Sequence, residues 1–262
     1  SIPPDDGGGG GGLVPKLSDE VLEEGSPELS QETLKQIEQE AQTLYTRAKA
    51  QEAGFKQLLE GLDNSHNTLE LGALLKSKTS IVSKLTRKQG RVESLNDLLR
   101  GAVIVPSKEQ LDRQLVLITT HLREQGIPHK IEYKENASGY RGVHVQFTHN
   151  DVPAEIQVHT AKNWEIKKRQ DGSYHIAREE ETNPTLTKEE WEHLIQESKR
   201  LGQESDLDIN LFTSFEVIST ESSSAASLNL RKSENDLNLT HILRLKSNSK
   251  TPSSPGAEIA YT

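Results

Sequence analysis

The clearest pattern of apolar and polar positions in the chain lies between residues 139 and 160. In residues 143–148, and again in residues 154–159, every second residue is apolar, so each segment has one apolar and one polar face when extended. Residues 148–151 suit the turn between the two segments. The pattern therefore predicts a β-hairpin whose polar positions include His144, Gln146, Glu155, Gln157 and His159.

Apolar residues at helical spacing predict helices around this hairpin. Residues 30–62 form the longest such segment, with Ser30 as its N-cap, and residues 69–88 form the next. Residues 95–105 and 129–134 are expected to be strands. Further helices are predicted over residues 107–125, 161–170 and 183–203. The order of these elements indicates an α/β (α+β) domain over residues 30–203, with a mixed sheet of about four to five strands flanked by helices.

The two ends of the chain have a different composition. Residues 1–29 contain a run of six glycines, prolines and acidic residues, which is typical of a flexible linker. Residues 204–262 are rich in Ser and Thr, and their apolar pieces are short and scattered. Hydrophobic residues make up only 32% of the chain, so we expect this second segment to be a largely disordered tail that can serve as a docking segment for a partner protein.

Charge and composition restrict the classes of function. The net charge of −9 argues against general affinity for nucleic acid. The chain has no cysteine, which excludes disulfides, cysteine nucleophiles and cysteine-based metal sites. It has no apolar run long enough to span a membrane, and its first residues do not read as a secretory signal. These features fit a cytoplasmic protein, and they leave the oligomeric state open.

A spaced set of cations precedes the hairpin. Lys76, Ser80 and Lys84 are four residues apart, so on a helix they share one face, where two ammonium groups and a hydroxyl can hold a polyphosphate. A solvated basic face is the commoner role of such lysines. Asp97 and Arg100 follow on an apolar segment, where a carboxylate is costly to bury unless an ion pair or a metal compensates it.

Two motifs of the hairpin carry a resemblance to a known family. The sequences GYRGVH at 139–144 and EIQVHT at 155–160, in this order and at hairpin spacing, resemble the synthetase domain of the RelA/SpoT family. The resemblance covers roughly residues 71–180 and implies a nucleotidyltransferase-like fold. It also implies a pyrophosphokinase that moves pyrophosphate from ATP to the 3′-hydroxyl of a guanine nucleotide. No His-Asp pair of the family's hydrolase domain occurs, so the resemblance points to a small, synthetase-only member.

The resemblance also implies roles for individual residues. Asp97 and Glu155 would bind Mg²⁺ and act in catalysis, with Glu155 as base or as orienter of the acceptor hydroxyl. The expected ATP-binding residues are Lys76, Ser80, Lys84 and Arg100. The expected acceptor-binding residues are Tyr140, His144, Gln157, Lys134 and Ser138, and His159 and His175 are further candidates.

Two departures from the family keep other functions open. Leu74 occupies a position where the family often has an arginine that stacks on adenine, and Asn136 and Ser138 alter the segment before Gly139. One alternative is a toxin-type enzyme that modifies adenine nucleotides or the 3′ end of tRNA, with the basic cluster at 162–169 on RNA phosphates. Such a protein would act in its own cytoplasm or in that of another cell. The second alternative is a non-catalytic module that binds nucleotides.

Overall fold

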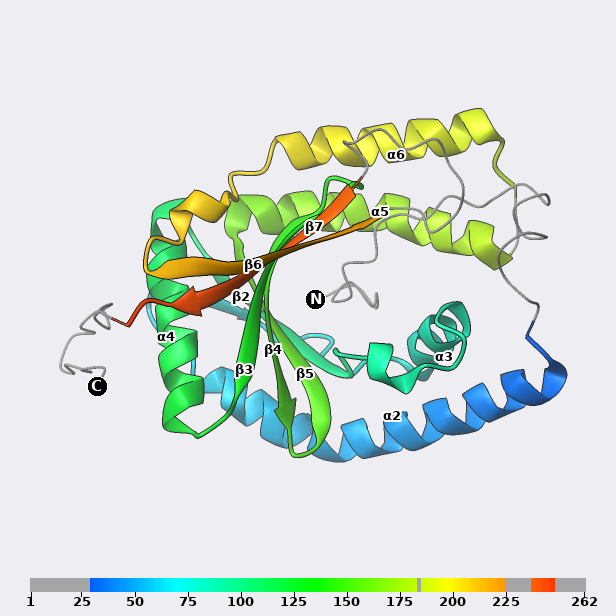
Figure 1. Ribbon diagram of the computed structural model, residues 1–262, viewed down its shortest axis with the longest axis horizontal. Helices are drawn as coiled ribbons and strands as arrows, with labels where there is room; N and C mark the ends of the chain where they lie inside the picture. The colour runs from blue at the N-terminus through cyan, green and yellow to red at the C-terminus, as the bar shows by residue number, and fades with distance from the viewer. Residues whose placement is uncertain (1–28, 183–184, 225–236, 248–262) are drawn as a thin grey trace.

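The computed structural model describes residues 29–182, 185–224 and 237–247 (Figure 1). Within them, seven strands form one mixed sheet in the order β1-β2-β5-β4-β3-β7-β6. The strands are β1 (Thr68–Glu70), β2 (Leu99–Val105), β3 (His129–Glu135), β4 (Arg141–His149), β5 (Val152–Thr160), β6 (Phe215–Ser224) and β7 (Leu237–Leu245). The helices are α2 (Gln31–Glu60), α3 (Lys78–Arg87), α4 (Leu111–Glu124), α5 (Ala161–Thr182) and α6 (Lys188–Gln203), with short 3₁₀ turns η2 (Val92–Ser94), η3 (Lys108–Gln110) and η4 (Ile209–Leu211). The predicted class, a mixed sheet flanked by helices, is confirmed, although the sheet has more strands than the four to five expected.

The predicted hairpin is the centre of the sheet. β4 and β5 pair in antiparallel register, with Val143 opposite Val158 and His144 opposite Gln157. The two-residue loop between them has positive φ at both Asn150 (46°) and Asp151 (66°), the conformation of a tight hairpin turn whose twist matches that of the strands. β5 also pairs with β2, and this pair is parallel. The hairpin thus joins the antiparallel strands to the parallel pair.

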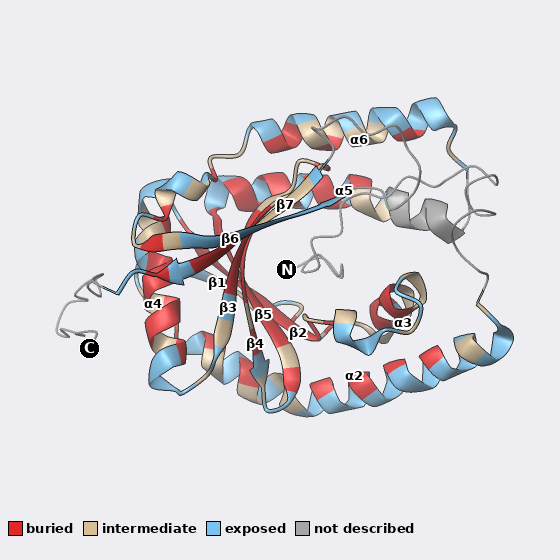
Figure 2. Cartoon of the chain, viewed as in Figure 1, coloured by how far each residue is buried: buried red, intermediate tan, exposed pale blue. Residues whose placement is uncertain are grey.

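One face of the sheet packs on the main hydrophobic core. Phe55 and Leu59 of α2 and Ile118 of α4 are fully buried in one cluster with Val145 and Ile156 of the hairpin. Fully burying a side chain of this size stabilises the fold by about 1.5–3 kcal/mol. Figure 2 shows this division, with the central strands largely buried and the outer faces of α2 and α6 exposed. The apolar residues of the alternating pattern thus form the core, and the polar residues lie on the opposite face of the sheet.

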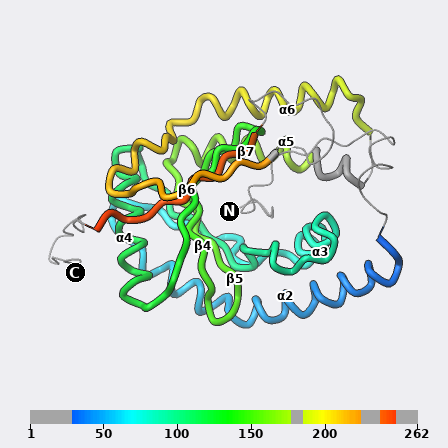
Figure 3. The backbone as a smooth tube through the Cα atoms, in the orientation of Figure 1, coloured from blue at the N-terminus to red at the C-terminus, as the bar shows by residue number. Residues whose placement is uncertain are grey.

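Outside the sheet, four of the helices pack in two pairs. α5 and α6 pack together on one side of the molecule, and α2 and α3 pack together on the other (Figures 1 and 3). At the β2 end of the polar face, Trp164 of α5 is buried against Ala102 and Ile104. Within the described residues, no helix is apolar over a length that could cross a membrane.

Two helix starts follow the sequence closely. Ser30 accepts a hydrogen bond from the backbone N–H of Thr33 and begins α2, and Thr187 and Glu190 form a capping box at the start of α6. α5 is longer than expected, since it continues past Gln170 to Thr182. Gly172 lies inside this helix and does not end it.

The single helix predicted over residues 69–88 is wrong. Its first part is strand β1, and α3 begins only at Lys78, after the N-cap Ser77. The backbone between them is tied to the start of β2: the N–H of Lys76 donates to the carbonyl of Leu98, and the N–H of Arg100 donates to the carbonyl of Leu74. Pairing with the sheet satisfies these backbone groups and outweighs the helical pattern of the leucines.

The boundary predicted at residue 203 is also wrong. Part of the supposed tail forms β6 and β7, and β7 pairs with β3 so that Leu243 lies opposite Ile131. Phe212, Phe215 and Leu243 are buried in the main core. The scattered apolar pieces therefore find their partners through long-range strand pairing, which local patterns do not reveal. The predicted linker over residues 1–28 and the rest of the tail, at 225–236 and 248–262, lie outside the described residues.

Candidate active site

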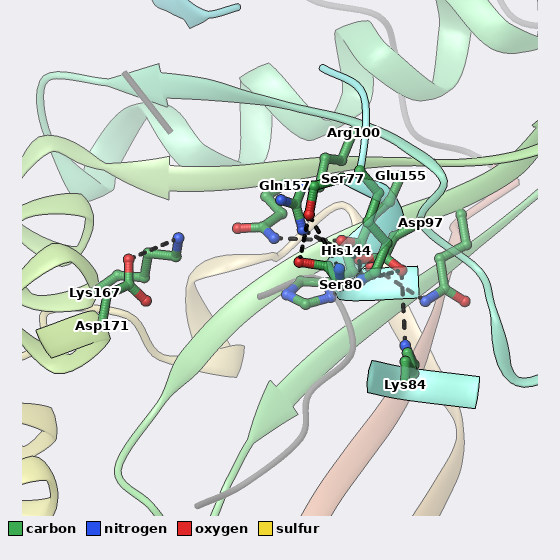
Figure 4. Close-up of polar contacts among 12 residues, drawn as sticks. Ser77, Ser80, Lys84, Asp97, Arg100, His144, Glu155, Gln157, Lys167 and Asp171 are labelled. Carbon is green, nitrogen blue, oxygen red and sulfur yellow. Dashed lines mark hydrogen bonds and ion pairs between the residues drawn. The ribbon is translucent and has the colours of Figure 1, made fainter. Parts of the chain in front are cut away.

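Three cations surround one buried carboxylate at the start of β2. The Nζ atom of Lys76 lies 3.3 Å from Oδ2 of Asp97, and that of Lys84 lies 3.7 Å from Oδ1. The guanidinium of Arg100 lies 3.7 Å from Oδ2 (Figure 4). The side chains of Lys76 and Asp97 have no exposed surface, so these charges compensate one another at low dielectric. Asp97 thus lies in an ion-pair cluster, and both of its expected roles, ion pairing and metal binding, start from this arrangement.

The local backbone explains why this cluster forms. Contrary to the prediction, Asp97 lies not on β2 but two residues before it, where the chain turns into this strand. Lys76 is fixed beside it by the backbone link to Leu98, and Lys84 reaches it from the buried face of α3. Ser80 is buried in the first turn of α3, where its backbone N–H donates to the Ser77 hydroxyl. Lys76, Ser80 and Lys84 therefore come together without sharing a single helix.

Arg100 has a buried guanidinium with unused donors. Its side chain is 3% exposed, and its Nε and NH1 atoms make no hydrogen bond to any described residue. Its contact with Asp97 is an ion pair at 3.7 Å, too long for a hydrogen bond. Buried donors without an acceptor are rare in native proteins because they forfeit the hydrogen bonds that water would provide. These donors are therefore the feature of the site that most directly calls for an anionic ligand.

A second carboxylate lies on the neighbouring strand. Glu155 of β5 is the register partner of Arg100 in the parallel β2–β5 pair, and it is fully buried. Its Oε1 atom lies 2.9 Å from Nδ1 of His144, although the direction of the ring N–H does not fit a regular hydrogen bond. Its two oxygens also accept from the side-chain amides of Gln146 (3.4 Å) and Gln157 (3.3 Å). Arg100, a member of the Asp97 cluster, thus lies on the strand next to the Glu155 cluster.

Tyr140 lies against the polar face beside these groups. Its hydroxyl oxygen is 2.6 Å from Nε2 of His144, and its ring meets the rings of His144 and His159 edge to face. The ring can lie on the strand because position 142 is a glycine: a Cβ there would collide with the Tyr140 hydroxyl. Tyr140 is half-buried, so the structure places it in the site and binds its polar tip to the sheet.

The remaining predicted residues are placed unequally. Lys134 is buried on β3 and Gly142 is its register partner, so it lies next to the site. Ser138 is buried, and its carbonyl accepts from the hydroxyl of Ser198 on α6. His159 is fully buried beside Gln157. His175 lies one helical turn beyond Asp171 on α5 and interacts electrostatically with that carboxylate.

Several residues of this region were missed by the sequence analysis as site residues. Gln146 and Asn163 contact Glu155 and His159, respectively. Lys167 forms a buried ion pair with Asp171 at 3.1 Å, and its ammonium lies 5.0 Å from the ring centre of Trp164. Burial raises the pKa of the Asp171 carboxyl, while Lys167 opposes this rise. The alternation already placed Gln146 on the polar face, but nothing in the sequence pointed to Asn163.

The donor atoms present fit a magnesium ion shared with a substrate. No group of three or more His, Cys, Asp or Glu side chains that could hold a metal is found among the described residues. A metal cage made by the protein alone is therefore not seen in that part of the chain. Mg²⁺, however, commonly takes only one or two carboxylates and completes its shell with water and phosphate oxygens. Asp97 and Glu155 are the two carboxylates that suit this role.

Comparisons with known proteins identify one family over part of the chain. Residues 74–178 match the family described as "Region found in RelA / SpoT proteins", which is less than half of the chain. A search of curated proteins found no match. One similar solved structure is the complex between the Type VI effector Tas1 and its immunity protein, at 17% identity and a TM-score of 0.42, covering 62% of this chain and 94% of that chain. A second is the small alarmone synthetase 1 from Bacillus subtilis, at 16% identity and a TM-score of 0.41, covering 65% of this chain and 92% of that chain. A third is a GTP pyrophosphokinase family protein from Streptococcus pneumoniae, at 18% identity and a TM-score of 0.34, covering 67% of this chain and 92% of that chain.

These TM-scores are below 0.5, so the assignment rests on the family match and on the arrangement of the residues. The matched region begins at Leu74, just before the first lysine of the Asp97 cluster. It ends in α5, after the hairpin that carries Glu155. Both carboxylate clusters lie inside it, so the part of the chain that matches the RelA/SpoT family is also the part that carries the candidate site.

Proposed function

We propose that the protein is a pyrophosphokinase that transfers the β,γ-pyrophosphate of ATP to the 3′-hydroxyl of a guanine nucleotide. The observation that carries the proposal is the buried guanidinium of Arg100, whose unused donors lie beside Asp97 on the strand next to that of Glu155. A polyphosphate held there would satisfy these donors and lie beside a carboxylate able to take a proton. The family match over residues 74–178 supports the same class of reaction.

The donor side consists of cations that hold a triphosphate. Lys76, Lys84 and Arg100 all surround Asp97, so a polyphosphate that enters the site meets three positive charges in a buried environment. Such preorganised charges stabilise the negative charge that develops on the phosphoryl oxygens as the bond breaks. Ser80, buried at the start of α3, would add a hydroxyl donor. When bound, Mg²⁺ would neutralise phosphate charge with Asp97 and Glu155 as its protein ligands.

The chemical step is a displacement at the β-phosphorus. The acceptor 3′-oxygen forms a bond to this phosphorus, the bond to the oxygen bridging the α- and β-phosphorus breaks, and AMP leaves with the electron pair. The hydroxyl proton passes to Glu155, which acts as base. Gln146 and Gln157 hold the Glu155 oxygens, and His144 lies against Oε1, so the carboxylate is oriented before the substrate arrives.

The acceptor side would use the residues around Tyr140. The tyrosine ring would offer a face to the guanine base, with Lys134 and Ser138 beside it. Such nucleotides are cytoplasmic, so we place the protein in a cytoplasm, either of its own cell or of a recipient cell.

A tRNA acceptor receives little support from the basic cluster on α5. Lys167 is buried with Asp171, Lys168 pairs with Glu165 at 2.6 Å, and Arg169 lies 3.5 Å from Glu204. Acidic partners within the protein thus already compensate most of this cluster, which therefore attracts phosphates weakly. A guanine nucleotide is the acceptor we favour.

The proposal is tested with ATP labelled separately at the α-, β- and γ-phosphorus and incubated with GDP, GTP, ATP or tRNA. Pyrophosphate transfer moves both β and γ label to the acceptor and leaves α label on AMP. Label on GDP or GTP is the expected result. Label on ATP or tRNA would show that this molecule, and not a guanine nucleotide, is the acceptor. Transfer of γ label alone would indicate an ordinary kinase. Binding of ATP without any transfer would identify a non-catalytic module.

A further inference from the structure

A directed chain of hydrogen bonds runs from α5 to Glu155. The side-chain amide nitrogen of Asn163 lies 2.8 Å from Nδ1 of His159, and Nε2 of His159 lies 3.0 Å from Oε1 of Gln157. Nε2 of Gln157 then donates to Oε2 of Glu155 at 3.3 Å. His159, Gln157 and Asn163 are all buried, so each of these bonds is made away from bulk water. The direction of every bond follows from the groups at the two ends.

At the α5 end, the orientation of Asn163 is fixed by its other partners. The same amide nitrogen donates to the backbone carbonyl of Arg141 at 2.9 Å, and a carbonyl oxygen can only accept. The Oδ1 atom of Asn163 accepts from the hydroxyl of Ser205. The second N–H of the amide therefore points at Nδ1 of His159, which must carry a lone pair. His159 is thus the neutral tautomer with its proton on Nε2.

At the β5 end, the same direction is required independently. An ionised carboxylate accepts hydrogen bonds and cannot donate them, so the amide nitrogen of Gln157 must face Glu155. This places Oε1 of Gln157 toward His159, where it accepts from Nε2–H. The two ends of the chain agree on one tautomer of His159 and one orientation of Gln157.

The surroundings of His159 favour the neutral ring. Burial lowers its pKa well below the ordinary value for histidine, and the nearby cation Lys167 and His144 lower it further. Trp164 of α5 and Tyr140 contact the ring from two sides, at centroid distances of 5.3 and 6.4 Å. Among the described residues, no carboxylate forms an ion pair with the ring that would stabilise an imidazolium. The tautomer is therefore held by geometry and by its environment together.

We propose that His159 is a positioning residue, which as the neutral Nε2–H tautomer holds the Gln157 amide so that it donates to Glu155. With the opposite tautomer, Gln157 would turn its oxygen toward the carboxylate, and two acceptors would face each other. Glu155 would then lose one of the contacts that orient it toward the acceptor hydroxyl. The role rests on the proposed function of Glu155, but the tautomer itself does not.

The kinetic test compares His159→Phe, which keeps a ring without a donor, with His159→Gln, whose amide can replace the Nε2–H donor. We expect Phe to lower kcat about tenfold, the upper range for one hydrogen bond, with little change in KM for ATP. Gln should restore kcat to within about threefold. In a Gln157→Leu background, His159→Phe should have little further effect, because His159 acts through Gln157. Additive losses, or equal losses in Phe and Gln, would overturn the positioning role.

The second test needs no turnover. In a long-range ¹H–¹⁵N spectrum of the full chain, the His159 signals, assigned by their loss in His159→Gln, should show a protonated Nε2 and an unprotonated Nδ1 near neutral pH. A protonated Nδ1, or an imidazolium at pH 7, would overturn the proposal. If the tautomer is found but no pyrophosphate transfer occurs, the proposed function fails while the hydrogen-bond chain stands.

Discussion

The hydroxyl of Tyr140 and the Nε2 atom of His144 lie 2.6 Å apart, so the ring expected to hold a base is itself tied to the sheet. His144 in turn lies 2.9 Å from Glu155, which links the proposed acceptor-binding side chain to the proposed base. A tyrosine in this place has two separable properties: a flat face, and a hydroxyl that contacts an imidazole. Substitutions can remove them one at a time.

Tyr140→Ala removes the face and the hydroxyl, while Tyr140→Phe removes only the hydroxyl. Base–aromatic stacking is worth about 1–3 kcal/mol, so Ala should raise the acceptor KM by about 5- to 150-fold and leave that for ATP nearly unchanged. Phe should keep the acceptor KM within about threefold. Steady-state kinetics with each substrate varied in turn measures both values. Equal increases in the KM for ATP would place Tyr140 outside the acceptor site.

The sequence predicted the hairpin because its information is local. Strict alternation and a two-residue turn with Asn150 and Asp151 define the strand pairing, so the polar face that carries Glu155 followed from the pattern. The sequence also predicted the residues that gather around Asp97, but the single helix on which it placed them is partly wrong. Lys76 reaches Asp97 through backbone bonds to β2, not through a shared helix face with Lys84.

Other features depend on contacts between distant segments, which a single sequence does not display. β7 joins the sheet because Leu243 pairs with Ile131, more than a hundred positions earlier in the chain. Asn163 enters the site because the chain turns from β5 into α5 and brings it under His159. The local sequence around Leu243 and around Asn163 has no pattern that distinguishes either residue from a surface position.

Removal of β6 and β7 should unfold the domain. Phe212, Phe215, Leu243 and Leu245 are buried in the main core, and at about 1.5–3 kcal/mol each they contribute on the order of 6–12 kcal/mol. This equals the whole stability of a typical domain, about 5–15 kcal/mol. A fragment of residues 29–203 should therefore lack a cooperative thermal transition, while one of residues 29–247 should retain it. A stable, cooperative 29–203 fragment would show that these strands are dispensable.

Lys76 should matter for stability as well as for ATP binding. Both Lys76 and Asp97 are fully buried, and removing one partner of a buried ion pair typically costs about 3–5 kcal/mol. Lys76→Met should lower the free energy of unfolding by an amount of this order, measured by urea denaturation. Adding Asp97→Leu should cost less than the sum of the two single losses, because the contact between Lys76 and Asp97 is then lost only once. Losses that simply add would mean that the two charges do not interact.

His159 should make stability depend on pH. Its pKa in the folded protein is lowered below the ordinary value near 6.5. Below pH 6.5, therefore, the ring is protonated in the unfolded chain but not in the folded protein. The free energy of unfolding should therefore fall as pH drops from 7.5 to 5.5, by at most about 1.4 kcal/mol per pH unit for this group. His159→Gln should have a shallower dependence than the parent protein in urea titrations. An identical slope would mean that the ring titrates normally.

The proposed function depends on Glu155 as a charged, oriented carboxylate. Glu155→Gln keeps the shape of the side chain but removes the charge that we propose binds magnesium and takes the ribose proton. Loss of general base catalysis alone typically costs about 10²–10⁴-fold in rate. A suitable control is Glu165→Gln, which removes the same charge from an exposed position on α5, where Glu165 pairs with Lys168.

The most direct measurement is single-turnover transfer of label from β-labelled ATP to GDP or GTP, with Glu155→Gln and Glu165→Gln compared at several magnesium concentrations. Melting curves first establish that both variants are folded. We predict that Glu165→Gln transfers label at a rate close to that of the parent protein, and that Glu155→Gln transfers almost none at any magnesium concentration. Near-normal transfer by a folded Glu155→Gln variant would contradict the assignment of this polar sheet face as the active site.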